Sequence, residues 1–269
     1  MSNPRLGSRG LLSLQLELTE RGVAILRQVG DLRLMTGKQI AAIHFPIDEH
    51  PSALAAARAR SRDLSRLTRQ QLLMRLQRRI GGVRAGSSSH IYALGPVGQR
   101  ILALNGPRRR FREPSAIFVD HTLAVSQLVV DLTLAARNGQ CEILNLQAEP
   151  DCWRTFSGAA GRVLLRPDLA VSVGVTEYEM SYFVEVDRGT EHLPALLRKC
   201  HTYEAYYRSG REQQTNEHGV FPRVCWIVPE ALRAERLGRA IESDRQLTKG
   251  LFLITTTDQA IDTLIRGPA

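Results

Sequence analysis

The segment ALAAARARSRDLSRLTR, residues 53–69, decides the fold of the first half of the chain. Its arginines recur at spacings of four, four and three residues, which places them in one stripe along a helix: Arg58, Arg62, Arg66 and Arg69. A separate apolar face is formed by Leu54, Ala57, Leu64 and Leu67. A solvated charged face usually mixes both signs, whereas only Asp63 interrupts this stripe. We therefore expect the helix to pack by its apolar face and to present its arginines to DNA phosphates or to guanine edges in a major groove.

Two shorter helices are expected before this one. Thr19 is a suitable N-cap for the first helix, which Gly30 is expected to end, and Thr36 and Gln39 have the spacing of a capping box at the start of the second. After residue 69 the pattern changes to a period of two, and residues 72–80 and 90–94 are predicted strands joined by a glycine- and serine-rich loop. Three helices followed by a β-hairpin form a winged helix-turn-helix, here with Arg84 at the tip of the wing. We assign residues 11–105 to this DNA-binding domain.

The charge of the chain is divided unevenly. Residues 1–115 contain 20 lysines and arginines against 7 acids, a net charge of +13, whereas residues 116–269 have a net charge of −4 and the whole chain +9. A basic half joined to a mildly acidic half is typical of a polyanion-binding module attached to a different module. The segment 106–116, with its two prolines and four arginines, is predicted to be the basic linker between them. Its arginines either extend the DNA-binding surface or are merely solvated.

The composition is that of a soluble globular protein. Of the 269 residues 43% are hydrophobic and 23% are charged, which excludes a collagen-like or wholly disordered chain. No uninterrupted apolar run approaches the ~20 residues that span a bilayer. Ser13, Gln15 and Glu17 interrupt the leucines near the N-terminus, so a signal peptide is not expected and the protein is predicted to be cytoplasmic. The four cysteines form no C-x-x-C pair, and Cys141 and Cys225 are expected to be reduced core residues.

Residues 117–269 are predicted to form a second, α/β domain. Helices are expected at 121–137, 191–208, 230–243 and from 258, and strands at 142–147, 163–173, 182–187, 224–228 and 251–255. The order α-β-β-β-α-β-α-β indicates a central sheet flanked by helices. The whole chain is therefore expected to be an α+β protein of two domains.

Three acidic residues of this domain lie in or beside apolar strands, where a carboxylate is costly to bury without a partner. They are Asp168, Glu185 and Asp187. Glu185 and Asp187 are two residues apart and project from the same face of one strand, so a neighbouring strand that carries Asp168 would bring all three to one hard cation such as Mg²⁺. The alternative is that these carboxylates pair with Arg166, Arg188 or helix N-termini.

The succession of Asp168, Glu185-x-Asp187 and a helix resembles the PD-(D/E)xK nuclease superfamily, whose core has the same α-β-β-β-α-β order. The resemblance implies a restriction-endonuclease-like fold, with Asp168 and Glu185 as metal-binding acids and Mg²⁺ or Mn²⁺ as cofactor. The third position of the motif, where the superfamily usually has lysine, is Asp187 in this chain. Lys199, from the following helix, is the candidate to replace that lysine in orienting the attacking water, and Tyr203 lies one turn further along the same face.

A longer string is more specific. Glu185-Val-Asp-Arg-Gly-Thr-Glu191, followed by Lys199 and Tyr203 and preceded by a winged helix, resembles the replication-relaxation family of plasmid and mobile-element proteins. The resemblance extends from about Leu11 to the end of the chain.

Other residues are weaker candidates for the site. His121 begins the first helix of the second domain, Glu142 lies on its first strand, and Tyr203 is either an accessory residue or part of the core. Lys199 is one of three lysines in an arginine-rich chain, which favours a role for its amine, although an ordinary exposed lysine is the alternative. Thr190 is expected to cap the helix that carries Lys199.

The sequence leads to one hypothesis and one rival. The first is a DNA-binding protein of a bacterial plasmid or mobile element, nucleoid- or plasmid-associated, with a Mg²⁺-dependent endonuclease or nickase site in its second domain. The rival is a non-catalytic replication or transfer accessory protein, or a transcription regulator, with a degenerate nuclease domain. Expected partners are double-stranded DNA and other plasmid replication or transfer proteins, but no membrane. A homodimer is compatible with a winged helix, although no heptad or unused apolar stripe demonstrates one.

Overall fold

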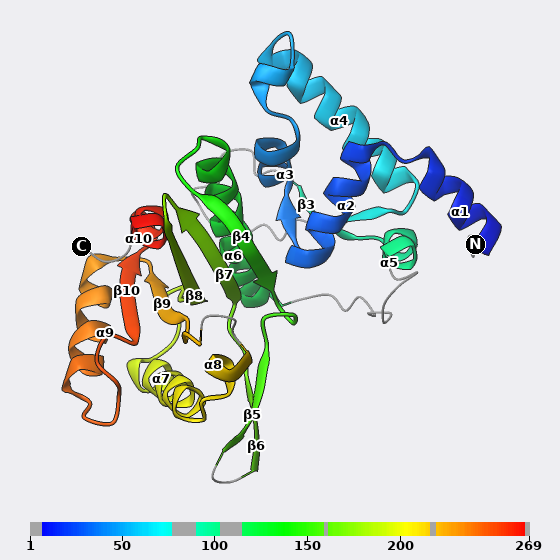
Figure 1. Cartoon of the computed structure of the whole chain (residues 1–269). Helices are drawn as coiled ribbons and strands as arrows, with labels where there is room; N and C mark the ends of the chain where they lie inside the picture. The colour runs from blue at the N-terminus through cyan, green and yellow to red at the C-terminus, as the bar shows by residue number, and fades with distance from the viewer. Residues whose placement is uncertain (1–6, 77–89, 103–114, 159–160, 216–218, 267–269) are drawn as a thin grey trace. The chain divides into compact units, whose positions relative to one another are not determined.

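The chain divides into two compact units, residues 1–130 and 131–269, in a computed structural model that describes residues 7–76, 90–102, 115–158, 161–215 and 219–266 (Figure 1). Both units mix helices and strands, so the protein has the expected α+β character. The division falls inside helix α6 (Ala116–Arg137), after Val130. Of the segment expected to be the linker, residues 106–114 lie outside the described residues, and residues 117–130, assigned above to the second domain, group with the first unit.

Unit 1 consists of helices around a small sheet. Its described elements are α1 (Ser8–Glu17), α2 (Glu20–Leu32), β1 (Met35–Thr36), α3 (Gly37–His44), a 3-10 turn (Ile47–Glu49), α4 (Ala53–Arg69), β2 (Leu73–Leu76), β3 (Ile91–Leu94), α5 (Pro96–Leu102) and the first part of α6. The strands form an antiparallel sheet in the order β1-β3-β2. Helices α2, α3 and α4 are thus followed by the strand pair β2–β3, as expected. The short strand β1 between α2 and α3 and the helices α1 and α5 were not indicated by the sequence pattern.

Local capping sets the start of the helices in unit 1. The Thr19 side chain accepts a hydrogen bond from the Gly22 backbone N–H at 3.1 Å, and both halves of the Thr36–Gln39 capping box are present. Helix α2 continues past Gly30 to Leu32, so the expected end at that glycine is wrong. A glycine inside a helix costs about 1 kcal/mol, and the packing of the apolar residues around it outweighs that cost.

Helix α4 begins and ends where the sequence predicted. Leu64 and Leu67 are buried, but Leu54 is 60% exposed and Ala56, rather than Ala57, is the buried alanine. The helix packs on β2 and on the 3-10 turn, and its first residues, 53 and 54, are exposed. The expected apolar face is therefore shorter than predicted.

Helix α6 is long and apolar enough, by length and composition alone, to cross a membrane, in contrast to the expectation from uninterrupted apolar runs. Its polar contacts are those of a core helix. Ser126 donates its hydroxyl proton to the carbonyl of Leu34 at 2.6 Å, and the Gln39 side-chain amide donates to the carbonyl of Leu123 at 2.9 Å. Further residues of the helix are buried, and 33% of its apolar window lies inside the structure.

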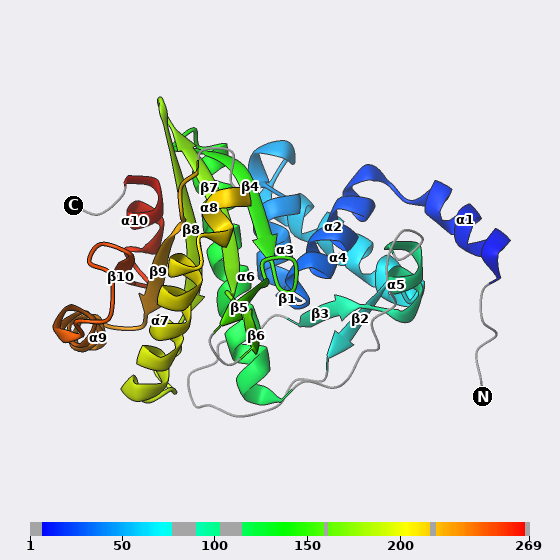
Figure 2. The same ribbon diagram turned by 60° about the horizontal axis from the view of Figure 1, so that its bottom comes forward.

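Unit 2 is built on a five-stranded sheet. Its described elements are β4 (Glu142–Ala148), β5 (Arg154–Gly158), β6 (Gly161–Leu165), β7 (Leu169–Val175), β8 (Tyr178–Val186), α7 (Leu193–Arg208), α8 (Arg211–Thr215), β9 (Arg223–Val228), α9 (Ala231–Ser243), β10 (Phe252–Thr256) and α10 (Ala260–Arg266). The strand order is β10-β9-β8-β7-β4, in which β8, β9 and β10 are parallel while β7 is antiparallel to both β8 and β4 (Figures 1 and 2).

Helices cover both faces of this sheet. Side chains of α7 and α9 share one apolar cluster with Phe183, Trp226 and Phe252. Helix α10 lies on the opposite face. Side chains alternate along a strand, so Thr255 points to the face opposite that of Phe252. The Thr255 hydroxyl lies 2.8 Å from the Thr263 hydroxyl of α10. Cys225 is buried as expected, whereas Cys141 is only half-buried at the start of β4.

A two-stranded ribbon, β5–β6, replaces part of the strand predicted at residues 163–173. That stretch is broken at Arg166–Asp168, and Pro167 lies in the break, where it has no N–H to donate to a sheet. The ribbon forms its own antiparallel sheet, with Arg154 opposite Leu165 and Gly158 opposite Gly161. It extends away from the five-stranded sheet in Figure 1.

Candidate functional site

Two of the three predicted acids lie side by side on neighbouring strands. Asp168 directly precedes β7 and Glu185 lies near the end of β8, and these strands pair with Leu169 opposite Val184. The Asp168 backbone N–H donates to the carbonyl of Val184 at 3.1 Å, and its carboxylate accepts from the Val186 N–H at 2.7 Å. These bonds on either side of Glu185 hold the Asp168 carboxylate beside it. Both residues are buried, with 8% and 2% of their surface exposed.

Helix α7 supplies two more side chains to this place. Lys199 and Tyr203 are four residues apart and share one face of the helix. The Lys199 ammonium forms an ion pair with one carboxylate oxygen of Glu185, and the Tyr203 hydroxyl donates to the other. The Lys199 side chain is 34% exposed, so the cluster opens to solvent on that side. Tyr203 is a buried core residue and also a direct partner of Glu185, so both alternatives considered for it hold together.

The electrostatics of the cluster are those of crowded carboxylates in a buried place. Burial raises the pKa of Glu185 to about 8, and the nearby Asp168 carboxylate adds to that rise, while Lys199 and Tyr203 oppose it. Burial disfavours the charged ammonium, but Glu185 and Asp168 outweigh this effect and raise the pKa of Lys199. Burial and the neighbouring Glu185 also raise the pKa of Tyr203, so its hydroxyl remains a hydrogen-bond donor. Lys199 thus balances only part of the negative charge of the two acids.

Asp187 lies apart from this cluster. It follows the end of β8, and its carboxylate forms an ion pair with Arg233 of α9 and accepts from the Gly189 N–H at 2.9 Å. Arg233 also donates to the carbonyl of Glu191 at 2.6 Å, so the pair ties the segment after β8 to α9. Among the described residues, no group of three or more His, Cys, Asp and Glu is placed to hold a metal ion. The two carboxylates brought together are those of Asp168 and Glu185.

The remaining candidates of the second half are dispersed. Glu142 is exposed and lies opposite Gly174 of β7, whereas Ala148, at the other end of β4, lies opposite Leu169. Gly174 is six residues from Asp168, so about 20 Å of strand separates Glu142 from Asp168. His121 is a half-buried residue of α6 within unit 1.

The cap expected for α7 is wrong. His192, not Thr190, occupies the N-cap position, and a proline in the first turn follows it. Pro194 favours a helix start at this point because its fixed φ suits the first turn. Thr190 and Glu191 therefore precede the helix, and the carbonyl of Glu191 is free to accept the bond from Arg233.

The predicted DNA-binding arginines lie on α4. Arg58, Arg62 and Arg69 are exposed, whereas Arg66 is half-buried and lies 3.4 Å from the Asp63 carboxylate. The stripe occupies the side of the helix opposite the buried leucines, because both sets repeat with the helical period. Arg84 lies outside the described residues.

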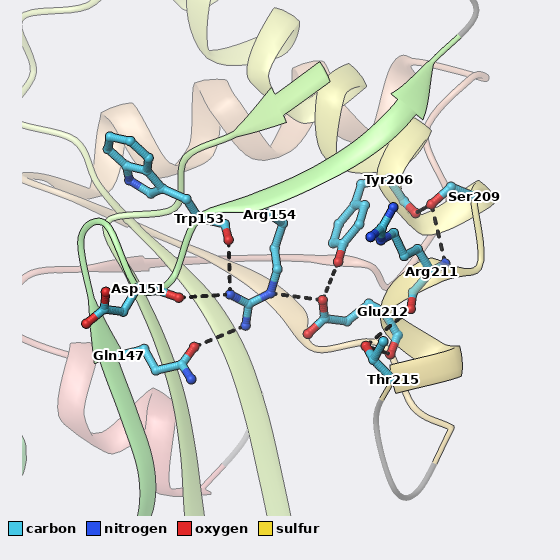
Figure 3. A network of polar contacts seen from close by, with 9 residues as sticks. All are labelled: Gln147, Asp151, Trp153, Arg154, Tyr206, Ser209, Arg211, Glu212 and Thr215. Carbon is cyan, nitrogen blue, oxygen red and sulfur yellow. Dashed lines mark hydrogen bonds and ion pairs between the residues drawn. The ribbon is translucent and has the colours of Figure 1, made fainter. Parts of the chain in front are cut away.

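Sequence reasoning missed a second polar network at the base of the β5–β6 ribbon (Figure 3). Arg154 donates to the Glu212 carboxylate at 3.0 Å, to the Gln147 side chain at 3.2 Å and to two backbone carbonyls. Glu212, which is buried, also accepts from the Tyr206 hydroxyl. The partners come from α7, α8 and β4, which are far apart in sequence, so no short motif could predict the network. The contact of Arg233 with Asp187 is likewise not predictable from a short motif.

Comparison with known proteins gives one family and one distant structure. A family model described as replication-relaxation matches residues 26–224, about three quarters of the chain. No curated protein matches the chain. The crystal structure of protein VC1899 from Vibrio cholerae aligns with 93% of this chain at 14% sequence identity and a TM-score of 0.30. The chain spans only 56% of the length of that protein.

Proposed function

The chain belongs to the replication-relaxation family, and from this premise we propose that it is a DNA-binding protein of plasmid or mobile-element replication whose second unit is a Mg²⁺-dependent DNA endonuclease or nickase. In this proposal unit 1 is a winged helix-turn-helix that holds double-stranded DNA, and unit 2 is a nuclease domain of the PD-(D/E)xK type. The family membership supports a role in replication.

The single observation that carries the nuclease proposal is the meeting of Asp168, Glu185 and Lys199. Two buried carboxylates lie on adjoining strands, and one ammonium reaches them from the next helix. Carboxylates can hold a divalent cation and an ammonium can stabilise charge on a phosphate, so this set suits phosphodiester hydrolysis. The order along the chain of α6, the sheet strands β4, β7 and β8, then α7 and β9 also supports the proposal, because the superfamily resemblance implies the order α-β-β-β-α-β.

The donor set fits Mg²⁺. This cation prefers oxygen ligands and is commonly bound through one or two carboxylates together with substrate phosphate oxygens. Burial and mutual repulsion raise the pKa of Glu185, and a cation between the two acids would relieve that repulsion. Asp168 and Glu185 would hold the ion, which when bound supplies Lewis-acid stabilisation of charge on the phosphate.

The other residues of the cluster have separate tasks. Lys199 orients the attacking water and offsets the charge of the scissile phosphate from the solvent-facing side of Glu185. Tyr203 fixes the Glu185 carboxylate from the buried side by donating its hydroxyl proton. Asp187, which stands where the superfamily usually has lysine, is held by Arg233 and positions the segment after β8.

A specific observation also favours the rival function. The Lys199 ammonium already neutralises Glu185 directly, and Asp187 is committed to Arg233, so the described residues include no three-acid metal group. In a non-catalytic accessory protein or regulator, Lys199 would take the place of the cation and the domain would serve to bind DNA or a partner.

Incubation of supercoiled plasmid with the full chain and Mg²⁺ or Mn²⁺ separates the two functions. Wild type should nick or linearise the plasmid, and Asp168→Asn or Glu185→Gln should reduce the rate about a hundredfold or more. Glu142→Gln is the matched control, because it removes an acid of the same unit about 20 Å from the cluster. Equal rates for wild type and all three variants would overturn the nuclease proposal and favour the accessory function.

Duplex affinity tests the role of α4. Arg58→Ala combined with Arg62→Ala removes two exposed charges and should lower affinity and reduce the slope of log K against log salt by about two. The control is Arg239→Ala combined with Arg266→Ala, two exposed arginines of unit 2. An unchanged salt slope in the α4 variant would remove this helix from the DNA interface.

A further inference from the structure

The β5–β6 ribbon begins and ends at the candidate site. It is inserted between β4 and β7, which are neighbours in the sheet, with Ala148 paired to Leu169 where the two strands meet the ribbon. Asp168 follows the last residue of β6 after only Arg166 and Pro167. The ribbon is therefore attached at the end of β4 and the start of β7, where the two buried carboxylates also lie.

The base of the ribbon is held rigidly. Phe156 and Leu165, on its inner face, are buried in the apolar cluster shared with α7. Arg154 is fixed by Glu212 and Gln147 (Figure 3). Its guanidinium also lies 5.4 Å from the centre of the Phe183 ring. A surface that is already ordered loses little conformational entropy on binding, so such a ribbon is suited to recognition.

The outer face of the ribbon has a different character. Its alternating side chains are those of Thr155, Ser157, Arg162 and Leu164. Ser157 lies opposite Arg162, and both are exposed. Within the described part of the chain no carboxylate pairs with Arg162, and the sequence 152–166 contains no acid. In the sequence, residues 157–161 are Ser-Gly-Ala-Ala-Gly, all of them small.

We propose that the β5–β6 ribbon enters a groove of duplex DNA beside the phosphate held at Asp168 and Glu185, with Arg162 and Ser157 bonded to the DNA backbone. This inference rests on the proposed function and specifies how unit 2 engages its substrate. A two-stranded β-ribbon fits the major groove, and arginine and serine side chains are common donors to phosphate oxygens. An outer face with one leucine offers little apolar area to a protein partner.

The geometry sets where the contact falls. Six residues separate Arg162 from Asp168, and because the chain turns at residues 166–168 their separation is at most about 20 Å at ~3.3 Å per residue. With about 3.4 Å per base pair, the Arg162 contact lies within about six base pairs of the phosphate at the acids, that is, within roughly half a helical turn. The ribbon thereby fixes the register of the duplex on unit 2.

Fluorescence anisotropy of the full chain on a duplex of about three helical turns tests the proposal. Arg162→Ala should weaken binding about three- to tenfold and reduce the salt slope by about one. Arg162→Lys keeps the charge and should bind nearly as well as wild type. Arg266→Ala is the matched control, because it removes an exposed arginine of the same unit on α10, at the opposite face of the sheet, and should leave affinity almost unchanged.

The outcomes separate this inference from the nuclease proposal. If Arg162→Ala binds like Arg266→Ala while Asp168→Asn loses cleavage, the ribbon contact is overturned and the nuclease proposal stands. If wild type does not cleave but Arg162→Ala still weakens binding beyond the control, the ribbon contact is supported and the nuclease proposal fails. In hydroxyl-radical footprints, loss of protection in Arg162→Ala should be confined to one region within about half a turn of the cleaved or Asp168-dependent position. A uniform loss would also contradict the proposal.

Discussion

Asp187→Asn and Arg233→Gln, made alone and together, measure what holds the segment after β8. The Asp187 side chain is 1% exposed and that of Arg233 21% exposed, so the carboxylate is buried while the guanidinium keeps some contact with solvent. Arg233→Gln leaves a buried carboxylate without its guanidinium and should cost about 3 kcal/mol, the lower end for a broken buried pair because Arg233 keeps some contact with water. Asp187→Asn retains the acceptor for the Gly189 N–H and should cost about 1.5–3 kcal/mol. The double variant should cost less than the sum by about 1.5–3 kcal/mol.

Urea unfolding followed by tryptophan fluorescence is the appropriate assay. The chain has two tryptophans, Trp153 and Trp226, and both lie in unit 2, so their emission reports the unit that contains the pair. Arg239→Gln is the control, since its pair with Glu235 is exposed and should change the free energy of unfolding by no more than about 0.5 kcal/mol.

Two results would refute this reasoning about Asp187. Additive effects in the double variant would mean that the pair contributes nothing as a pair. A loss of cleavage in Asp187→Asn as large as that in Asp168→Asn, with stability unchanged, would place Asp187 among the metal ligands instead of with Arg233. We expect Asp187→Asn to retain cleavage within several-fold of wild type.

Two further predictions concern stability. Burial alone would raise the pKa of Glu204, but hydrogen bonds from the Thr248 N–H and hydroxyl and from an arginine outweigh it and lower that pKa. The Glu204 carboxylate therefore stabilises the folded state above its unfolded pKa of about 4.3. This stabilisation is lost as pH falls through the folded pKa. The difference in unfolding free energy between wild type and Glu204→Gln should therefore be full at pH 7 and shrink below about pH 4; a constant difference would contradict the assignment. A Cβ at Gly98 would lie 2.1 Å from the carbonyl oxygen of Leu72, so Gly98→Ala should destabilise unit 1 by about 1–3 kcal/mol or more in thermal circular dichroism. Gly238→Ala, which meets no atom within 4 Å in α9, should instead be neutral or stabilising by up to about 1 kcal/mol.

Several features that depend on neighbours in sequence were predicted correctly, although the end of α2 and the cap of α7 were not. The capping box of α3 and both ends of α4 follow from side chains within a few residues, because helix capping and helical periodicity are local. The predicted strand at 163–173 was wrong because alternation of apolar residues continues through Pro167, and only the tertiary structure shows that the chain turns there from the ribbon into β7. The ribbon itself is held by Arg154, whose partner Glu212 is 58 residues away in sequence, and no local pattern can indicate such a contact.

The same distinction explains the candidate site. Strand periodicity correctly placed Glu185 and Asp187 on one face, since Phe183, Glu185 and Asp187 alternate along β8 and its extension. Different helices cover that face along the length of β8. Glu185 contacts Lys199 of α7, whereas Asp187 contacts Arg233 of α9. Residues that share a face therefore have different partners, and a period of two predicts the face but not the helix that covers it. Lys199 could be anticipated because it lies within the helix directly after strand β8. Arg233 belongs to α9, which follows another strand, β9. It reaches Asp187 only because β8 and β9 are parallel neighbours in the sheet.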